Sequence, residues 1–281
     1  MRFVKYQALG NDYLVMESEE LAAPLTVSQI ELICNRHYGV GSDGILLRQP
    51  DKDDGTFSLQ IFNPDGSWVE KSGNGLRIFS RYLWDRGVVT DQPFRVETPG
   101  GTVTCRVQEK GKLVVVDMGQ AIFNSGRIPV SGPTREILRE SLEIKGEPLE
   151  ISAVSMGNPH CVVHRDCPSE SEARRLGPLI ETHDIFPKRT NVQFMKVLDR
   201  ENIRIEIWER GAGYTLSSGT SSCAVCAVAH RLGLCGDKVT VHMPGGELRV
   251  EMGEGYQIRL TGPVGRVAEG LLDQEMVTGG S

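Results

Sequence analysis

Short motifs in the first half of this chain return in the second half in the same order. Four pairs recur 145 to 147 residues apart: Gly10-Asn11 with Gly157-Asn158, Ile61-Phe62-Asn63 with Ile207-Trp208-Glu209, Ser72-Gly73 with Ser218-Gly219, and Pro99-Gly100-Gly101 with Pro244-Gly245-Gly246. One pair could arise by chance, whereas four pairs in one register indicate an internal duplication. Two copies predict two similar α/β lobes rather than a solenoid. We expect lobes over residues 1–118 and 119–261, with a C-terminal strand in 262–281 returning to the first lobe.

The local patterns predict short strands and a few helices. Alternation at period two predicts strands over residues 59–62, 94–98, 102–107, 203–207, 238–242 and 257–260. Apolar spacing and capping residues predict helices over 29–36 (capped by Ser28), 134–142, 169–181, 74–84 and 220–232. A cleft between two similar lobes is a usual place for a small ligand.

Composition excludes several classes of protein. The 281 residues carry 31 Lys and Arg against 37 Asp and Glu, a net charge of −6, which argues against a phosphate-neutralising surface for nucleic acid. The longest apolar runs fall far short of the ~20 residues of a membrane span. The N-terminus lacks the apolar stretch of a signal peptide, and the seven scattered cysteines are an odd number. We therefore expect a cytoplasmic protein with reduced thiols.

Each half contains a strand end, a polar turn and a small-residue triplet that opens a helix. The triplets begin at Ser72 and Ser218. The first N–H groups of a helix and its dipole attract anions, so each helix start suits a carboxylate or a phosphate. Two ordinary capped helices are the alternative for each stretch alone, and the symmetrical recurrence favours the functional interpretation.

Polar residues near these helix starts suit an amino-acid ligand. Glu209 would pair with an ammonium group and Arg210 with a carboxylate. Side-chain amides that offer both donors and acceptors come from Asn11, Asn63, Asn158 and Asn191. His160 places an imidazole two residues after Asn158, although a lone histidine is more often structural. The CxxC pair Cys223 and Cys226 lies inside a predicted helix without a second pair, which argues against a zinc or redox site.

Six segments together resemble the diaminopimelate epimerase family. They are ALGNDYLVME (8–17), YGVGSDGILL (38–47), IFNPDGSWVEKSGNGLRIFSRYL (61–83), MGNPHCVV (156–163), RTNVQF (189–194) and WERGAGYTLSSGTSSCA (208–224). The resemblance implies an α+β fold of two pseudo-symmetric lobes, each with a mixed sheet wrapped round a central helix, and usually a homodimer. It implies epimerisation of an amino acid in lysine biosynthesis, without pyridoxal phosphate or a metal.

The resemblance also implies roles for individual residues. His160 and Glu209 would support the two proton-transfer groups. The substrate would be bound by Asn11, Asn63, Gly73, Asn74, Asn158, Asn191, Glu209, Arg210, Gly219 and Thr220. Some family members carry glutamine at the position of Gly44, opposite Asn191 in the repeat, for the distal end of the substrate.

The chain departs from the family at the two proton-transfer positions. The family has cysteine where this chain has Ser72 and Ser218. A serine hydroxyl is much less acidic than a thiol and needs a neighbouring base to act as one. Lys71, Ser217 and Ser221 also differ from the usual pattern, which argues against a designed exchange of the two cysteines alone.

Two interpretations of the paired serines stay open. In the first, the chain is a natural branch that still interconverts stereoisomers or shifts a double bond with other bases. The candidate bases are Lys71, Asp65, His160 and Glu209, while Ser72 and Ser218 occupy the acid/base positions. Alternatively, the chain binds an amino acid without turnover. We expect a cofactor-independent epimerase that interconverts L,L- and meso-diaminopimelate at Cα. A non-catalytic amino-acid-binding homologue and a one-base isomerase of a small carboxylic acid are the alternatives.

Overall fold

The computed structural model describes residues 1–273 together with 275 and 276. Its contacts divide the chain into two units, residues 1–116 with the segment from 262 onward, and residues 117–261. We refer to them as unit 1 and unit 2. The expected C-terminal return extends to residue 281, and its positions 274 and 277–281 lie outside the described residues.

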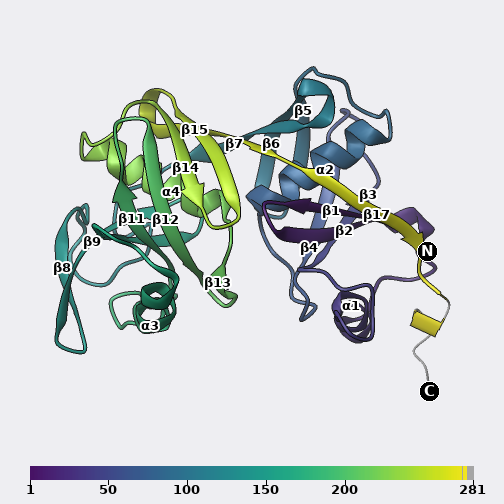
Figure 1. The fold of residues 1–281 in the computed structure, drawn as a ribbon. Coiled ribbons are helices and arrows are strands. Elements are labelled where there is room, and N and C mark those ends of the chain that lie inside the picture. Colours follow the sequence, from purple (N-terminus) through teal and green to yellow (C-terminus); the bar gives the residue numbers. More distant parts are fainter. Residues whose placement is uncertain (274, 277–281) are drawn as a thin grey trace. The chain divides into compact units, whose positions relative to one another are not determined.

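Unit 1 is a mixed sheet with a central helix (Figure 1). Its strands lie in the order β17-β1-β2-β3-β4-β5-β6-β7, and only the pairs β2–β3 and β4–β5 are parallel. Helix α2 contacts β1, β2 and β6. The bounds are β1 Arg2–Ala8, β2 Asn11–Glu17, α1 Val27–Cys34, β3 Ile45–Gln49, β4 Phe57–Phe62, α2 Gly73–Asp85, β5 Phe94–Thr98, β6 Gly101–Gln108, β7 Leu113–Gln120 and β17 Gly265–Leu271.

Unit 2 repeats the strand order and directions of unit 1. Its sheet is β8-β9-β10-β11-β12-β14-β15-β16, with β10–β11 and β12–β14 parallel, and β13 adds to the end of β12. The bounds are β8 Glu140–Ile144, β9 Glu147–Ser155, β10 Pro159–His164, α3 Glu170–Glu181, β11 Asn191–Val197, β12 Asn202–Glu209, β13 Gly213–Thr215, α4 Gly219–Arg231, β14 Lys238–Met243, β15 Gly246–Met252 and β16 Gln257–Pro263. The predicted duplication is therefore confirmed in the order and direction of the strands.

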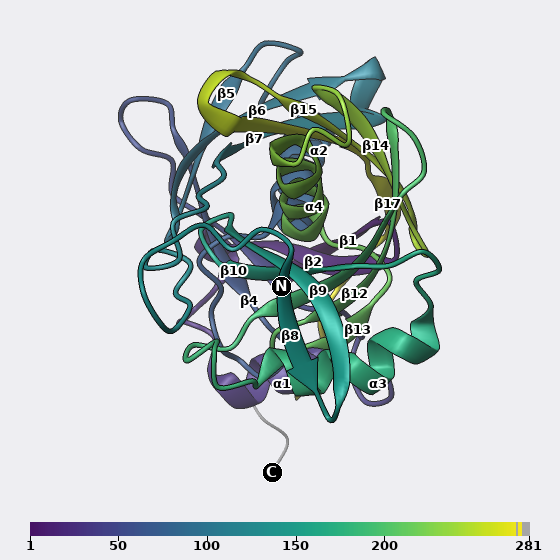
Figure 2. The same ribbon diagram turned by 90° about the vertical axis from the view of Figure 1, so that its left-hand side faces the viewer.

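Helix α4 lies in the middle of the curved sheet of unit 2 (Figure 2). It contacts β9, β10, β11, β12, β14 and β15. Its residues from Ser221 to Ala229 are all buried and almost all small, so the strands can approach the helix on every side. Burial on all sides holds the start of α4 rigidly against the sheet.

The six predicted strands are confirmed, and so are the helices predicted over 74–84, 169–181 and 220–232. The helix predicted over 134–142 is wrong. Residues Glu140–Ile144 form β8, because Leu142 and Ile144 alternate with exposed residues and pair with β9 in a hairpin. Helix α1 starts two residues earlier than expected, since Thr26 rather than Ser28 accepts the N–H of Gln29 in a capping box.

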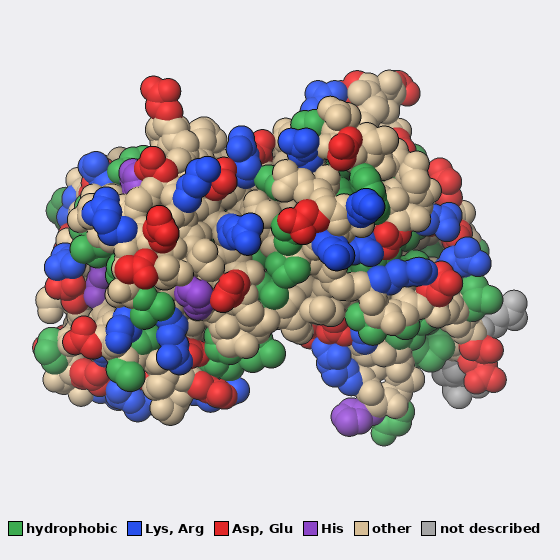
Figure 3. All heavy atoms as spheres, turned by 45° about the horizontal axis from the view of Figure 1, so that its top comes forward, with side chains coloured by type: hydrophobic (Ala, Val, Ile, Leu, Met, Phe, Trp, Pro, Cys, Tyr) green, Lys and Arg blue, Asp and Glu red, His purple; other side chains and the backbone are tan. Residues whose placement is uncertain are grey.

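The surface carries charges of both signs. Figure 3 shows Lys and Arg side chains interspersed with Asp and Glu over the face that it displays. Within the described residues, no helix combines the length and apolar character needed to cross a bilayer.

Candidate active site

The N-terminus of α2 carries the predicted serine of unit 1. Ser72 is the N-cap in an extended conformation, and its Oγ accepts the N–H of Gly75 at 3.0 Å. Gly73 and Asn74 follow in the first turn, and both are buried. The helix dipole places partial positive charge at this end of α2, so this helix start favours an anion near Ser72.

The N-terminus of α4 repeats this arrangement in unit 2. Ser218 is the N-cap, and its Oγ accepts the N–H of Ser221 at 3.4 Å. Thr220 Oγ1 lies 3.5 Å from the same hydroxyl oxygen. Ser218 is more deeply buried than Ser72, with 2% of its surface exposed. The two serines predicted from the repeat are therefore equivalent caps of equivalent helices.

The amide of Asn11 is held by neighbours on both sides. Its Oδ1 accepts from Asn74 Nδ2 at 3.0 Å, and its Nδ2 donates to Asp43 Oδ2 at 3.0 Å. Asn63 follows the end of β4, and its Nδ2 donates to Ser67 Oγ at 3.0 Å. Asn11 and Asn74 therefore meet directly in unit 1, whereas Asn63 belongs to the turn after β4.

A buried chain of hydrogen bonds runs through His160 in unit 2. Gln193 Nε2 lies 3.1 Å from His160 Nδ1 and donates to Ser221 Oγ at 3.0 Å, and His160 Nε2 lies 2.9 Å from Asn158 Oδ1. With Gln193 donating to Nδ1, the imidazole proton is on Nε2 and points to Asn158. Burial and the charge of Arg210 outweigh the Gln193 contact and lower the pKa of His160 to about 3. His160 is thus a neutral donor to Asn158.

The strand ends of unit 2 place the other predicted residues. Asn191 Nδ2 donates to Pro159 O at 2.9 Å, and Asn191 Oδ1 accepts the backbone N–H of Arg210 at 3.0 Å. Glu209 is the last residue of β12 and is half-buried, while Arg210 is exposed. The Arg210 guanidinium donates to Lys188 O at 3.2 Å. Asn191 therefore fixes the turn that carries Glu209 and Arg210.

One of the alternative proton acceptors, Asp65, is placed less favourably. Asp65 is exposed and accepts the hydroxyl of Ser67 at 2.6 Å and its N–H at 3.0 Å, and these contacts hold the pKa of Asp65 below its usual value. Lys71 is half-buried directly before Ser72. A carboxylate stabilised in this way is a weak base.

The CxxC pair of unit 2 lies inside a helix, as the sequence predicts. Cys223 and Cys226 are fully buried inside α4, and none of the seven cysteines forms a disulfide bond. Burial raises the pKa of the Cys226 thiol. Among the described residues, no group of three or more His, Cys, Asp or Glu side chains could hold a metal ion.

Sequence reasoning missed two residues that contact the predicted set. Gln193 lies two positions after Asn191 on β11, and period two places both on one face of the strand, which was the available signal. Asp43 lies in the segment 38–47, whose spacing alone gave it no role. Each residue contacts a predicted side chain directly: Gln193 contacts His160, and Asp43 contacts Asn11.

The chain matches known proteins over most of its length. The family model described as diaminopimelate epimerase matches residues 3–124 and 152–267. Diaminopimelate epimerase 2 of Nostoc sp. is 51% identical over 276 residues, which cover 98% of this chain and 97% of the relative. Diaminopimelate epimerase of Pelotomaculum thermopropionicum is 41% identical over 275 residues, with 96% and 98% covered.

Solved structures of low sequence identity share the fold. A probable proline racemase from Agrobacterium radiobacter superposes with a TM-score of 0.72 at 14% identity, covering 97% of this chain and 92% of that one. A hydroxyproline epimerase from Agrobacterium vitis, with bound trans-4-OH-L-proline, gives 0.70 at 16% identity, with 96% and 91% covered. At such identities the likeness concerns the fold alone.

Proposed function

Because the chain belongs to the diaminopimelate epimerase family, we propose that it is an isomerase that converts L,L-diaminopimelate to meso-diaminopimelate in lysine biosynthesis. One observation supports this function most directly. In each unit the buried central helix begins at an N-cap serine, which is Ser72 for α2 and Ser218 for α4. Inversion at a carbon needs one group that removes the proton and a second that returns one to the opposite face, so a duplicated acid/base position fits the reaction.

The proposed chemistry starts after a neighbouring base, for which Lys71 and Glu209 are the candidates, has taken the hydroxyl proton of one serine. The resulting serine alkoxide then removes the Cα proton. The electron pair of the C–H bond passes into the neighbouring carboxylate, and the second hydroxyl gives its proton to the opposite face of Cα. The N–H groups of Gly75 and Ser221 point at the two oxygens and would stabilise the negative charge that each carries in turn. The positive end of each helix acts in the same sense.

We propose that the remaining predicted residues bind the substrate. Glu209 would meet an ammonium group and Arg210 a carboxylate. His160 would act by orienting Asn158, because its proton is directed to Asn158 Oδ1. The other proposed binding residues are Asn11, Asn63, Gly73, Asn74, Asn158, Asn191, Gly219 and Thr220.

We also propose that the protein works as a cytoplasmic homodimer without pyridoxal phosphate or a metal. That none of the seven cysteines forms a disulfide bond supports a reducing compartment. Protein treated with hydroxylamine and a chelator, then dialysed, should keep its full rate. Light scattering should give about twice the mass of the 30.9 kDa chain.

The decisive experiment follows the Cα proton of L,L-diaminopimelate in D₂O by NMR. Exchange with inversion supports the proposed reaction. Exchange with retention would indicate one-base chemistry on a small carboxylic acid, and saturable binding without exchange would indicate a binding protein.

Serine replacements connect this reaction to the two helix starts. Ser72→Ala and Ser218→Ala should each slow inversion by roughly 1,000-fold, because each removes one of two proton-transfer groups. The double change Ser72→Cys and Ser218→Cys should raise turnover, since a thiol gives up its proton more readily.

Ser169→Ala is the matched control for these replacements. Ser169 is the N-cap of α3 and accepts the N–H of Glu172 at 3.2 Å, so its loss removes a comparable cap. The control should lose roughly 1 kcal/mol of stability and no activity. An unchanged rate in both alanine variants of the site would rule out these serines as the acid and base.

A further inference from the structure

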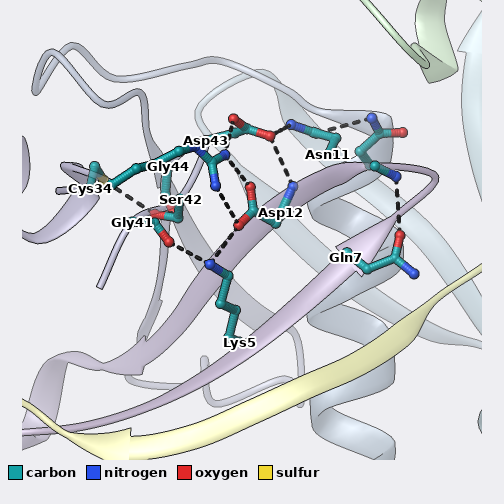
Figure 4. Close-up of polar contacts among 12 residues, drawn as sticks. Lys5, Gln7, Asn11, Asp12, Cys34, Gly41, Ser42, Asp43 and Gly44 are labelled. Carbon is teal, nitrogen blue, oxygen red and sulfur yellow. Dashed lines mark hydrogen bonds and ion pairs between the residues drawn. The ribbon is translucent and has the colours of Figure 1, made fainter. Parts of the chain in front are cut away.

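Asp43 belongs to the segment 38–47, which carries part of the family resemblance. The proposed reaction assigns no role to Asp43. Asp43 lies in the loop before β3, and this loop is tied to two strands. The N–H of Asp43 donates to Asp12 O at 2.9 Å, and Lys5 Nζ donates to Gly41 O at 2.6 Å (Figure 4). The carboxylate of Asp43 is therefore held at a fixed place beside the start of β2.

A directed series of hydrogen bonds connects Asp43 with the interior of α2. Arg77 Nη2 donates to Asn74 Oδ1 at 2.9 Å, Asn74 Nδ2 donates to Asn11 Oδ1 at 3.0 Å, and Asn11 Nδ2 donates to Asp43 Oδ2 at 3.0 Å. Arg77 is fully buried, and Asn74 is 5% exposed.

The two ends of this series fix its direction. A guanidinium can only donate, so Asn74 must present its oxygen to Arg77 and its nitrogen to Asn11. An ionised carboxylate can only accept, so Asn11 must present its nitrogen to Asp43 and its oxygen to Asn74. If either amide flipped, so that its oxygen and nitrogen exchanged places, it would lose a hydrogen bond to a charged group. Such a hydrogen bond is stronger than one between neutral groups.

The carboxylate of Asp43 is itself fully engaged. Its Oδ2 also accepts the N–H of Asp12 at 3.0 Å (Figure 4). Its Oδ1 accepts a hydrogen bond from Arg36 Nη2 at 2.7 Å. Arg36 is shared with Asp12, at 2.6 Å, and Lys5 pairs with Asp12 at 2.8 Å. These contacts leave Asp43 to orient its neighbour rather than to bind a ligand ion.

Resting on the proposed function, in which Asn11 binds the substrate, we propose that Asp43 is a positioning residue that holds the Asn11 amide in its binding orientation. The arrangement is specific to unit 1. The corresponding position in unit 2 is Thr190, which is fully buried and donates to Asn191 O. Asp43 therefore acts on substrate affinity through Asn11 and touches none of the reacting atoms.

Asp43→Asn tests this role because asparagine keeps the size of the side chain but offers a donor as well as an acceptor. The Asn11 amide can then flip, with its oxygen and nitrogen exchanged, and lose a hydrogen bond to the substrate. We expect KM for L,L-diaminopimelate to rise roughly tenfold and kcat to stay within about twofold, since an interaction lost equally from ground and transition states changes KM alone. NMR of the full chain should show that one side-chain N–H of Asn11, protected from exchange in the wild type, loses its protection.

Asp51→Asn is the matched control. Asp51 accepts Arg48 Nη2 at 2.8 Å, and its side chain is 36% exposed against 39% for Asp43. The control weakens one ion pair at a similarly exposed carboxylate and should keep KM.

The outcomes separate the two proposals. A wild-type protein that catalyses exchange, with a KM that Asp43→Asn leaves unchanged, would overturn this inference and spare the proposed function. A wild-type protein that neither binds nor exchanges diaminopimelate would overturn both.

Discussion

The two units share a backbone and a helix cap, but they hold their equivalent asparagines in different ways. Asn11 in unit 1 is fixed by Asp43, which Arg36 anchors in a partly exposed cluster of ions. Asn158 in unit 2 is fixed by the neutral, fully buried His160. The residues that carry the unit 2 contacts, His160, Gln193 and Ser221, have Tyr13, Leu46 and Gly75 at the positions 146 or 147 residues earlier.

Packing explains why unit 1 lacks the second set of contacts. A Cβ on Gly75 would come within 3.1 Å of Leu46 Cδ2, so a serine there would require Leu46 to move. In unit 2 the longer, polar Gln193 meets the Ser221 hydroxyl instead. The duplication thus preserves the N-cap serine, while each copy has its own means of orienting its equivalent asparagine.

The largest difference between the units should appear at Gly44 and its counterpart Asn191. Gly44 has φ +153°, and a Cβ there would lie 2.2 Å from Phe62 O, so no side chain fits on this backbone. Gly44→Asn should cost about 3 kcal/mol or more of the free energy of unfolding, measured by urea denaturation. Asn191→Gly should cost less, because it removes hydrogen bonds without creating a clash.

Equal losses in these two variants would contradict the difference in backbone between the units. The same clash means that a family member with glutamine at this position needs a different backbone there. Unit 1 of this chain therefore cannot carry the amide that unit 2 presents from Asn191.

The second difference is a dependence of stability on pH that His160 contributes in unit 2. His160 has a pKa of about 3 in the folded state against 6.5 as its ordinary value. As the pH falls below 6.5 the unfolded chain takes up a proton at this residue and the folded chain does not, so stability is lost progressively toward pH 3. Relative to neutral pH, the loss from His160 should be roughly 2 kcal/mol at pH 5.

Urea unfolding of the wild type and of His160→Gln at pH 7 and pH 5 measures this contribution. The variant should be the less stable protein at pH 7 and should lose less on acidification. The Asp43→Asn variant serves as the control from unit 1 and should keep the histidine-dependent loss. Identical pH profiles for wild type and His160→Gln would show that His160 titrates normally.

The sequence predicted the parts of the molecule that local patterns and the repeat determine. The helix starts at Ser72 and Ser218 were predicted because a cap and small residues are local signals. The contacts of Asn11 with Asp43 and with Asn74 could not be predicted, because they join residues 32 and 63 positions apart in the chain. The helix expected over 134–142 failed since pairing of β8 with β9 outweighed local propensity.

The smallest effect should come from giving unit 2 the residues of unit 1. Gln193→Leu with Ser221→Gly installs the counterparts Leu46 and Gly75. The change removes the donor to His160 Nδ1, but it also removes Gln193 Oε1, which has no hydrogen-bond partner among the described residues. These terms oppose each other, so stability should change by only about 1 kcal/mol. Nitrogen NMR should show His160 shifting from the Nε2–H tautomer toward a mixture of tautomers. KM should rise roughly threefold, because Asn158 is less firmly oriented.

Ser221→Gly alone is the control that keeps the Gln193 contact with His160 and should leave the tautomer unchanged. A wild-type His160 protonated on Nδ1 would reverse the direction of the whole series, and Asn158 would then present its oxygen rather than its nitrogen away from the imidazole.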